Sequence, residues 1–257
     1  MGKMMGVDAN DAVKTTQGFD YTCVGIEKLG ATEYTIVQII VDRSGSVSDF
    51  RCDLEKMIGS VVDACKKSPR AMNLLIRVTT FCAEPFADRV NIEEIHGFTI
   101  LETIDSSKYA NTINPEGTTP LFEATMEAID TIYDYAEKLY DKEYFCNGII
   151  FIITDGENNV IKTATPASIK QKIAEIKRNE KVLESLRTVL IGINDKECQT
   201  SLDEFHKQSG LDEYVSVGEA SPNKLAKLAD FVSQSVSSQS NSLGSGGPSQ
   251  QIENFKF

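Results

Sequence analysis

The stretch YTIVQIIVDRSGS, residues 34–46, decides the fold. Tyr34 to Val41 is a short apolar run rich in β-branched residues, which is typical of a strand buried on both faces. The polar residues 42–46 follow directly, and after Ser48 the sequence changes to a helical period. A buried strand that passes through a polar loop into a helix indicates an α/β protein. The apolar residues on one face of this helix are Phe50, Leu54, Met57, Ile58, Val61, Val62 and Cys65.

Strand-like and helix-like segments alternate in this way as far as residue 236. The alternation predicts a doubly wound, mostly parallel central sheet with helices on both faces, a Rossmann-like α/β fold. Ligands of such sheets bind at loops that leave the C-terminal ends of the strands, here after Val41, Thr154 and Ile193. Further strands are predicted at 72–82, 98–104, 148–154, 188–193 and 214–217, and further helices from Pro120, Pro166, Leu202 and Pro222.

Composition divides the chain into four segments. Residues 1–18 are polar and are predicted to be a flexible N-terminal segment, and residues 19–33 are a candidate for an extra edge strand. Residues 34–236 form the predicted domain. Residues 237–257 are predicted to be a disordered tail, because a segment rich in Ser, Gly and Gln buries little apolar surface.

The overall charge limits the classes of partner. Asp and Glu total 38 against 26 Lys and Arg, which gives a net charge of −12. This balance argues against nucleic acid and against an anionic membrane surface, because both need clustered Lys and Arg. The N-terminus lacks the apolar run of a signal peptide, and the six cysteines are scattered without a C-x-x-C pair. We therefore expect a cytoplasmic protein with reduced cysteines, and its oligomeric state is left open.

Oxygen-bearing side chains gather after two predicted strands and before a predicted helix. Asp42, Ser44 and Ser46 follow the first strand, Asp155 follows the strand at 148–154, and Thr119 precedes the helix that begins at Pro120. Carboxylate and hydroxyl oxygens are ligands for a hard cation. Because the site would carry only two carboxylates, we expect Mg²⁺ there, with Mn²⁺ and Ca²⁺ as alternatives.

The order D-x-S-x-S, then a threonine in a G-x-T loop, then an aspartate in a T-D-G turn resembles a known motif. It is similar to the metal-ion-dependent adhesion site (MIDAS) of von Willebrand factor A (vWA) domains, and the chain resembles the intracellular vWA proteins of bacteria and their viruses. The resemblance covers residues 34–236 and includes the order of strands and helices. Asp42, Ser44, Ser46, Thr119 and Asp155 match the five motif positions, with Thr118 as the alternative threonine.

The resemblance implies a metal-dependent protein–protein interaction module. Ser44, Ser46 and Thr119 would bind the cation directly or through water, and an Asp or Glu of a protein partner would complete its coordination. Arg43 is interpreted as a solvated turn residue, with pairing to the partner's carboxylate as the alternative. Three further acidic residues are expected near the rim, where they would either tune the site or be ordinary surface charges: Glu116, Glu157 and Asp195.

Two alternative functions remain. An aspartate after the first strand also resembles haloacid dehalogenase-like phosphatases, but these place a second aspartate where Ser44 stands here. No P-loop is present, because Gly-Lys-Ser/Thr does not follow residues 44–46. We therefore expect a protein that is not an enzyme. The alternatives are a structural subunit with a vestigial metal site and a Mg²⁺-dependent phosphatase-like hydrolase.

Overall fold

A mixed eight-stranded sheet runs through the middle of the computed structural model, which describes residues 11–15, 18–84, 90–160, 162–179 and 181–245. The strand order is β1-β2-β5-β4-β3-β6-β7-β8. The β1–β2 and β4–β5 pairs are antiparallel and the other pairs are parallel. The strands are β1 Asp11–Lys14, β2 Asp20–Cys23, β3 Glu33–Asp42, β4 Leu74–Ala83, β5 Val90–Ile100, β6 Phe145–Thr154, β7 Leu186–Ile193 and β8 Glu213–Gly218.

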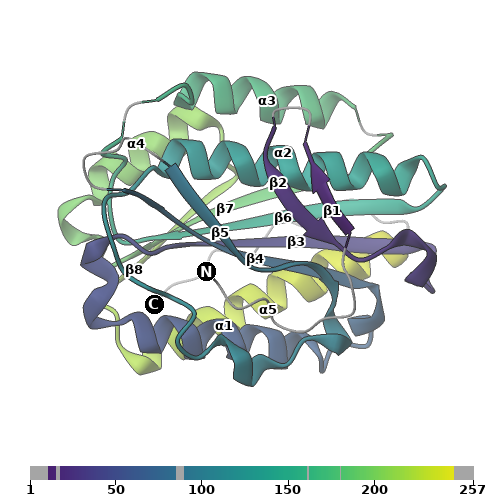
Figure 1. Cartoon of the computed structure of the whole chain (residues 1–257), viewed down its shortest axis with the longest axis horizontal. Helices are drawn as coiled ribbons and strands as arrows, with labels where there is room; N and C mark the ends of the chain where they lie inside the picture. The colour runs from purple at the N-terminus through teal and green to yellow at the C-terminus, as the bar shows by residue number, and fades with distance from the viewer. Residues whose placement is uncertain (1–10, 16–17, 85–89, 161, 180, 246–257) are drawn as a thin grey trace.

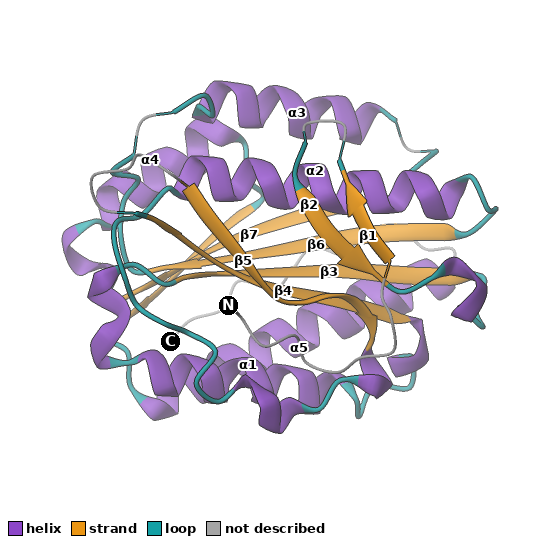
Figure 2. Ribbon diagram, in the orientation of Figure 1, coloured by secondary structure: helices purple, strands orange, loops and turns teal. Residues whose placement is uncertain are grey.

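In the described part of the chain, five α-helices cover the sheet in two layers. Helices α1 and α5 pack on one face, and α2, α3 and α4 pack on the other (Figures 1 and 2). The doubly wound α/β fold predicted from the alternation is confirmed. Among the described residues, no helix has both the length and the apolarity to cross a bilayer. The helices are α1 Arg51–Cys65, α2 Leu121–Tyr140, α3 Pro166–Arg178, α4 Gln199–Ser209 and α5 Pro222–Gly244.

Strand β3 shows why the sheet is buried on both faces. Successive side chains of a strand point to opposite faces. Val37 and Ile39 lie in the apolar layer beneath α1 and α5, whereas Ile36 and Ile40 lie in the layer beneath α2. Burying this many large aliphatic side chains contributes about 1.5–3 kcal/mol for each, before the loss of chain entropy is counted.

Strand β3 also marks the switch in strand order. The chain passes from β3 to β4 on one side and later returns to β6 on the other, so the C-terminal ends of β3 and β6 lie side by side. In open α/β sheets this is the position at which ligands bind. Asp42 and Thr154 end these two strands.

Strand β5 differs from the prediction. The sequence predicted a strand at 98–104, but β5 spans residues 90–100 and residues 101–103 form a 3-10 turn. The first half of β5 has polar side chains such as Asn91 and Glu93, which conceal its strand character in a search for apolar runs. Pairing with β4 through backbone hydrogen bonds decides its structure.

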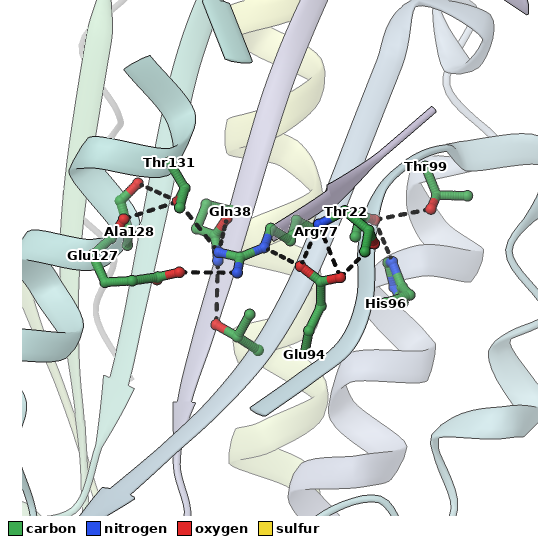
Figure 3. Close-up of polar contacts among 11 residues, drawn as sticks. Thr22, Gln38, Arg77, Glu94, His96, Thr99, Glu127, Ala128 and Thr131 are labelled. Atoms are coloured by element: carbon green, nitrogen blue, oxygen red, sulfur yellow. Dashed lines mark hydrogen bonds and ion pairs between the residues drawn. The ribbon is translucent and has the colours of Figure 1, made fainter. Parts of the chain in front are cut away.

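A buried charged cluster joins β4 to the neighbouring elements. Arg77 on β4 is fully buried, with its Nε 2.7 Å from Glu94 Oε2 and an Nη 2.9 Å from Glu127 Oε1. Its other Nη donates to Gln38 and to Thr131 (Figure 3). Two carboxylates and two neutral acceptors thus surround one guanidinium, which is how a charge is tolerated inside a protein.

The predicted N-terminal segments need correction. Residues 1–18 were predicted to be flexible, but residues 11–14 form β1, the outermost strand, which pairs with β2. The predicted extra edge strand at 19–33 is present as β2, residues 20–23, and it lies one strand inside the edge. Residues 1–10 of the predicted flexible segment lie outside the described part.

The predicted disordered tail at 237–257 is wrong for its first part. Helix α5 continues to Gly244. Its serines fit closely against the domain, with Ser240 Oγ accepting a 3.2 Å hydrogen bond from Arg70 Nε and Val236 fully buried. Packing of a helix face against the core outweighs the weak helix propensity of serine. Residues 246–257 lie outside the described part of the chain.

Candidate metal site

Asp42 is the deepest residue of the predicted site. It ends β3, and its side chain is 1% exposed. Oδ1 accepts a 2.8 Å hydrogen bond from the Ser44 backbone N–H, and Oδ2 accepts a 2.6 Å hydrogen bond from the Thr154 hydroxyl. Asp42 therefore fixes both the start of its own loop and the end of the neighbouring strand β6.

The two serines bring the second carboxylate to the same place. Ser44 Oγ lies 3.1 Å from Ser46 Oγ, and Ser46 Oγ donates a 2.9 Å hydrogen bond to Asp155 Oδ1. Asp155 directly follows β6, so the contact joins residues 109 positions apart in the sequence. Four of the five predicted residues thus form one continuous group of oxygens, with Ser46 exposed at its surface.

Thr119, in the third loop, lies beside the turn that follows Asp155. It is buried and lies over the turn after Asp155, because a Cβ placed on Gly156 would stand 3.5 Å from Thr119 Oγ1. Thr118 is exposed, and its backbone pairs with Ala83 at the end of β4. This arrangement favours Thr119 over Thr118 as the threonine that faces the group.

Arg43 does not take either role expected for it. Its side chain is 2% exposed, so it is not a solvated turn residue. One Nη donates to Glu116 Oε1 at 2.7 Å and to Asn114 O at 3.1 Å, and the other lies 3.7 Å from Glu93 Oε2. Arg43 is therefore committed to this protein's own loops and is not available to pair with a partner.

The three acidic residues expected near the rim fall into different classes. Glu157 is exposed two residues after Asp155. Glu116 is also exposed but is held by Arg43, and the hydrogen bond and charge of Arg43 lower the pKa of its carboxyl. Asp195 is fully buried and accepts hydrogen bonds from Tyr214 and Ser216, so it is a structural residue of the β7–β8 end.

Several supporting residues were missed by the sequence analysis. Asn159 accepts a 2.7 Å hydrogen bond from the Thr119 backbone N–H and donates its own backbone N–H to Thr119 O. Cys198 donates from Sγ to Asp155 O at 3.4 Å. Asn159 follows Thr154 and Cys198 follows Ile193, in loops that the sequence had indicated, but neither residue belongs to a recognisable motif, so only the fold reveals their contacts.

The electrostatics of the site suit a bound cation. Burial raises the pKa of Asp42 to about 6, although hydrogen bonds from Thr154 and Ser44 oppose the shift, and Asp155 raises it further. Burial likewise raises the pKa of Asp155. Burial disfavours the ionised forms of both carboxylates, and a cation bound beside them would remove that penalty.

The donor set also decides which kind of ion fits. Within the described ranges, no three His, Cys, Asp or Glu side chains cluster as ligands. A cation at this position would depend on the hydroxyls of Ser44, Ser46 and Thr119 beside the two carboxylates. Such an all-oxygen set fits Mg²⁺, Mn²⁺ or Ca²⁺.

Comparison with known proteins supports the fold. No protein-family model and no curated protein matches the chain. Among solved structures, a D319A mutant of the PilB minor pilin from Streptococcus sanguinis aligns over 85% of this chain and 64% of its own, with 15% identity and a TM-score of 0.56. A von Willebrand factor type A structure from Catenulispora acidiphila aligns over 85% of this chain and 44% of its own, with 14% identity and a TM-score of 0.50.

A third neighbour is described with a metal in its site. Proximal thread matrix protein 1 from the mussel byssus, with a zinc-occupied MIDAS motif, aligns over 81% of this chain and 47% of its own, with 16% identity and a TM-score of 0.50. This chain therefore spans between 44% and 64% of the length of these solved chains. Together with the strand order and the two helical layers, the likeness defines a vWA-like α/β fold.

Proposed function

We propose that this chain is a metal-dependent protein–protein interaction module. A divalent cation is held by Asp42, Ser44, Ser46, Thr119 and Asp155, and it coordinates an Asp or Glu of a protein partner. The observation that carries the proposal is the contact between the loops after β3 and β6 that gathers Asp42, Ser44, Ser46 and Asp155 at the switch in strand order, with Thr119 Oγ1 beside the turn at Gly156.

The low charge of the donor set explains the choice of partner. The donor set holds only two carboxylates beside neutral hydroxyls, so a cation bound there would accept an oxygen of a negative ligand to complete its coordination. An acidic side chain supplies an oxygen of the type that the cation prefers. We propose Mg²⁺ as the ion, with Mn²⁺ and Ca²⁺ as alternatives, and a cytoplasmic role like that of the intracellular vWA proteins of bacteria and their viruses.

A non-catalytic role fits the residues better than the phosphatase-like alternative. A phosphatase of that kind would need an acid two residues after its nucleophile, whereas Ser44 offers only a hydroxyl at that position, 3.1 Å from Ser46 Oγ. A structural subunit with a vestigial site remains the main alternative.

The test is calorimetric titration of the purified chain with Mg²⁺, Mn²⁺ and Ca²⁺. The Ser46→Ala variant removes a proposed ligand, and Ser48→Ala is a matched control, because Ser48 donates to Gly45 O outside the group of oxygens. One binding site that is lost in Ser46→Ala and kept in Ser48→Ala supports the proposal. No binding by the unaltered chain favours the vestigial site, and Mg²⁺-dependent turnover of a phosphate monoester would favour the hydrolase.

The partner side of the proposal needs its own measurement. Peptides with a central glutamate, and matched peptides with glutamine, would be titrated with the cation-loaded chain. Binding that requires both the cation and the glutamate is expected. Equal binding of both peptides would contradict the role of the carboxylate even if the cation binds.

A further inference from the structure

Arg43 occupies an unusual place, because it lies between two proposed cation ligands but has no contact with them through its side chain. Its backbone N–H donates a 3.0 Å hydrogen bond to Phe81 O, which extends the β3–β4 pairing by one residue. Its guanidinium is buried and contacts Asn114, Glu116 and, on β5, Glu93. The loop that carries Ser44 and Ser46 therefore begins from a fixed point.

The contacts of Arg43 join this loop to the loop that carries Thr119. Arg43 O accepts a 2.8 Å hydrogen bond from Glu116 N, and its side chain donates to Glu116 Oε1 at 2.7 Å. Two residues further along, Gly45 N donates to Gly117 O at 3.2 Å. Gly117 has a φ of +66°, a left-handed conformation that glycine adopts without strain, and Thr119 follows two residues later.

The arginine is suited to hold this arrangement rigidly. A guanidinium is planar and presents its donors in fixed directions, so it can bind Glu116 and the Asn114 carbonyl at once. Burial of the charge makes other positions of the side chain costly. Among the described residues, the buried Nε finds no hydrogen-bond partner, so the two Nη groups make the contacts that fix the side chain.

We infer that Arg43 is a positioning residue, which sets the distance between the Ser44 and Ser46 hydroxyls and the Thr119 hydroxyl and thereby the affinity of the site for a divalent cation. The inference rests on the proposed function, because it concerns the same cation. Residues that orient metal ligands through hydrogen bonds typically change metal affinity by about 10–100-fold when they are replaced.

The first experiment measures the affinity of the full chain for Mn²⁺ by calorimetry. Arg43→Met is expected to weaken Mn²⁺ binding by at least about tenfold. Arg43→Lys is expected to have an intermediate affinity, because lysine keeps the charge but lacks the planar guanidinium with its donors in fixed directions. Arg77→Lys is the matched control, since Arg77 is an equally buried arginine whose partners, Glu94 and Glu127, lie outside the site (Figure 3). It is expected to lower stability and leave Mn²⁺ affinity unchanged.

A double variant tests whether Arg43 acts through Thr119. The losses of Mn²⁺ affinity caused by Arg43→Lys and by Thr119→Ala are expected to be non-additive. When Arg43→Lys has already displaced the Thr119 hydroxyl, removing that hydroxyl costs less affinity than it does in the unaltered chain. Losses of affinity that simply add would overturn the inference, as would an equal loss in Arg43→Lys and Arg77→Lys.

A second measurement without any cation separates this inference from the proposed function. Amide hydrogen exchange reports local opening at the Gly45 and Glu116 N–H groups, which donate across the two loops. Faster exchange at these amides in Arg43→Lys, but not in Arg77→Lys, is expected. If the unaltered chain binds none of Mg²⁺, Mn²⁺ and Ca²⁺, the proposed function fails, and the exchange alone decides the positioning role. Unchanged exchange at both amides would overturn it.

Discussion

The Thr154 hydroxyl donates a 2.6 Å hydrogen bond to Asp42 Oδ2 between the ends of the two neighbouring strands β3 and β6. Both side chains are buried, so water does not replace this contact if it is lost. We expect Thr154→Val, which keeps the shape and removes the hydroxyl, to lower the free energy of unfolding by about 1–3 kcal/mol, as measured by urea denaturation.

Thr80 provides the matched control for this change. It is a buried threonine on β4 whose Oγ1 has no hydrogen-bond partner in the part of the chain that the structure describes. Thr80→Val is expected to leave stability unchanged or to raise it, because it removes a buried hydroxyl that makes no contact. An equal loss of stability in both variants would show that the Thr154–Asp42 contact contributes nothing specific.

Asp42→Asn is expected to stabilise the cation-free protein while it abolishes cation binding. Burial raises the pKa of Asp42 from 3.8 to about 6, so the ionised carboxylate is disfavoured in the folded state at neutral pH. A pKa shift of this size lowers the free energy of unfolding at neutral pH by about 1–3 kcal/mol, and the uncharged amide of asparagine removes this loss. Thermal unfolding at pH 7.5 in EDTA measures the gain, and a lower melting temperature of Asp42→Asn would contradict it.

The same pKa predicts how cation affinity changes with pH. The proton and the cation compete for Asp42, whose pKa is raised to about 6 by burial. Mn²⁺ affinity is expected to be constant above about pH 7 and to fall by up to about tenfold per pH unit below pH 6. Titrations between pH 5 and 8 measure this profile. Affinity that is flat down to pH 5 would show that Asp42 stays ionised without the cation.

His96 makes the folded protein less stable as the pH falls, whereas the raised pKa of Asp42 makes it more stable. Its ring is buried, with Nδ1 2.9 Å from Gly97 O and Nε2 2.7 Å from the Tyr109 hydroxyl. Burial lowers its pKa below 6.5, so the unfolded chain binds the proton more readily than the folded one. Its contribution to stability is complete above pH 6.5 and is lost as the pH falls below that value, by at most about 1.4 kcal/mol per pH unit.

Comparison with a variant isolates this contribution. His96→Gln keeps polar atoms in the same place but does not titrate, so the difference in unfolding free energy between the two proteins is expected to shrink as the pH falls from 7 to 5. Both proteins are best compared with Asp42→Asn in place, because protonation of Asp42 stabilises the folded protein as the pH falls below about 6. A difference that stays constant with pH would mean that His96 is protonated in neither state or in both.

The sequence was most informative where burial is continuous. Strands β3, β6 and β7 were predicted because their apolar runs are uninterrupted, and both faces of each are covered by helices. Strand β5 was misplaced because half of its side chains are polar and its backbone pairing with β4 comes from a distant segment. Local sequence patterns indicate which strands are buried, but they indicate only weakly which strands pair with one another across a long sequence distance.

The candidate site shows the same limit. The spacing of Asp42, Ser44 and Ser46 after a strand indicated a cluster of oxygens, and the fold brings Asp155 to them. The burial of Arg43 was not predictable, because its partner Glu116 lies 73 positions away and neither residue stands in an apolar pattern. Contacts between loops depend on the relative positions of whole strands, which no local motif contains.

Helix α5 continues into the Ser-rich stretch that composition predicted to be disordered from residue 237. Val236 stands directly before that stretch and is fully buried, whereas Gln234 is exposed on the same helix. Val236→Asp is expected to lower the free energy of unfolding by about 3 kcal/mol or more, because it places an unpaired charge in the layer beneath α1 and α5. Gln234→Asp should change it by less than about 0.5 kcal/mol. Circular dichroism and urea denaturation measure both, and equal, small effects would show that this part of the chain does not pack against the sheet in solution.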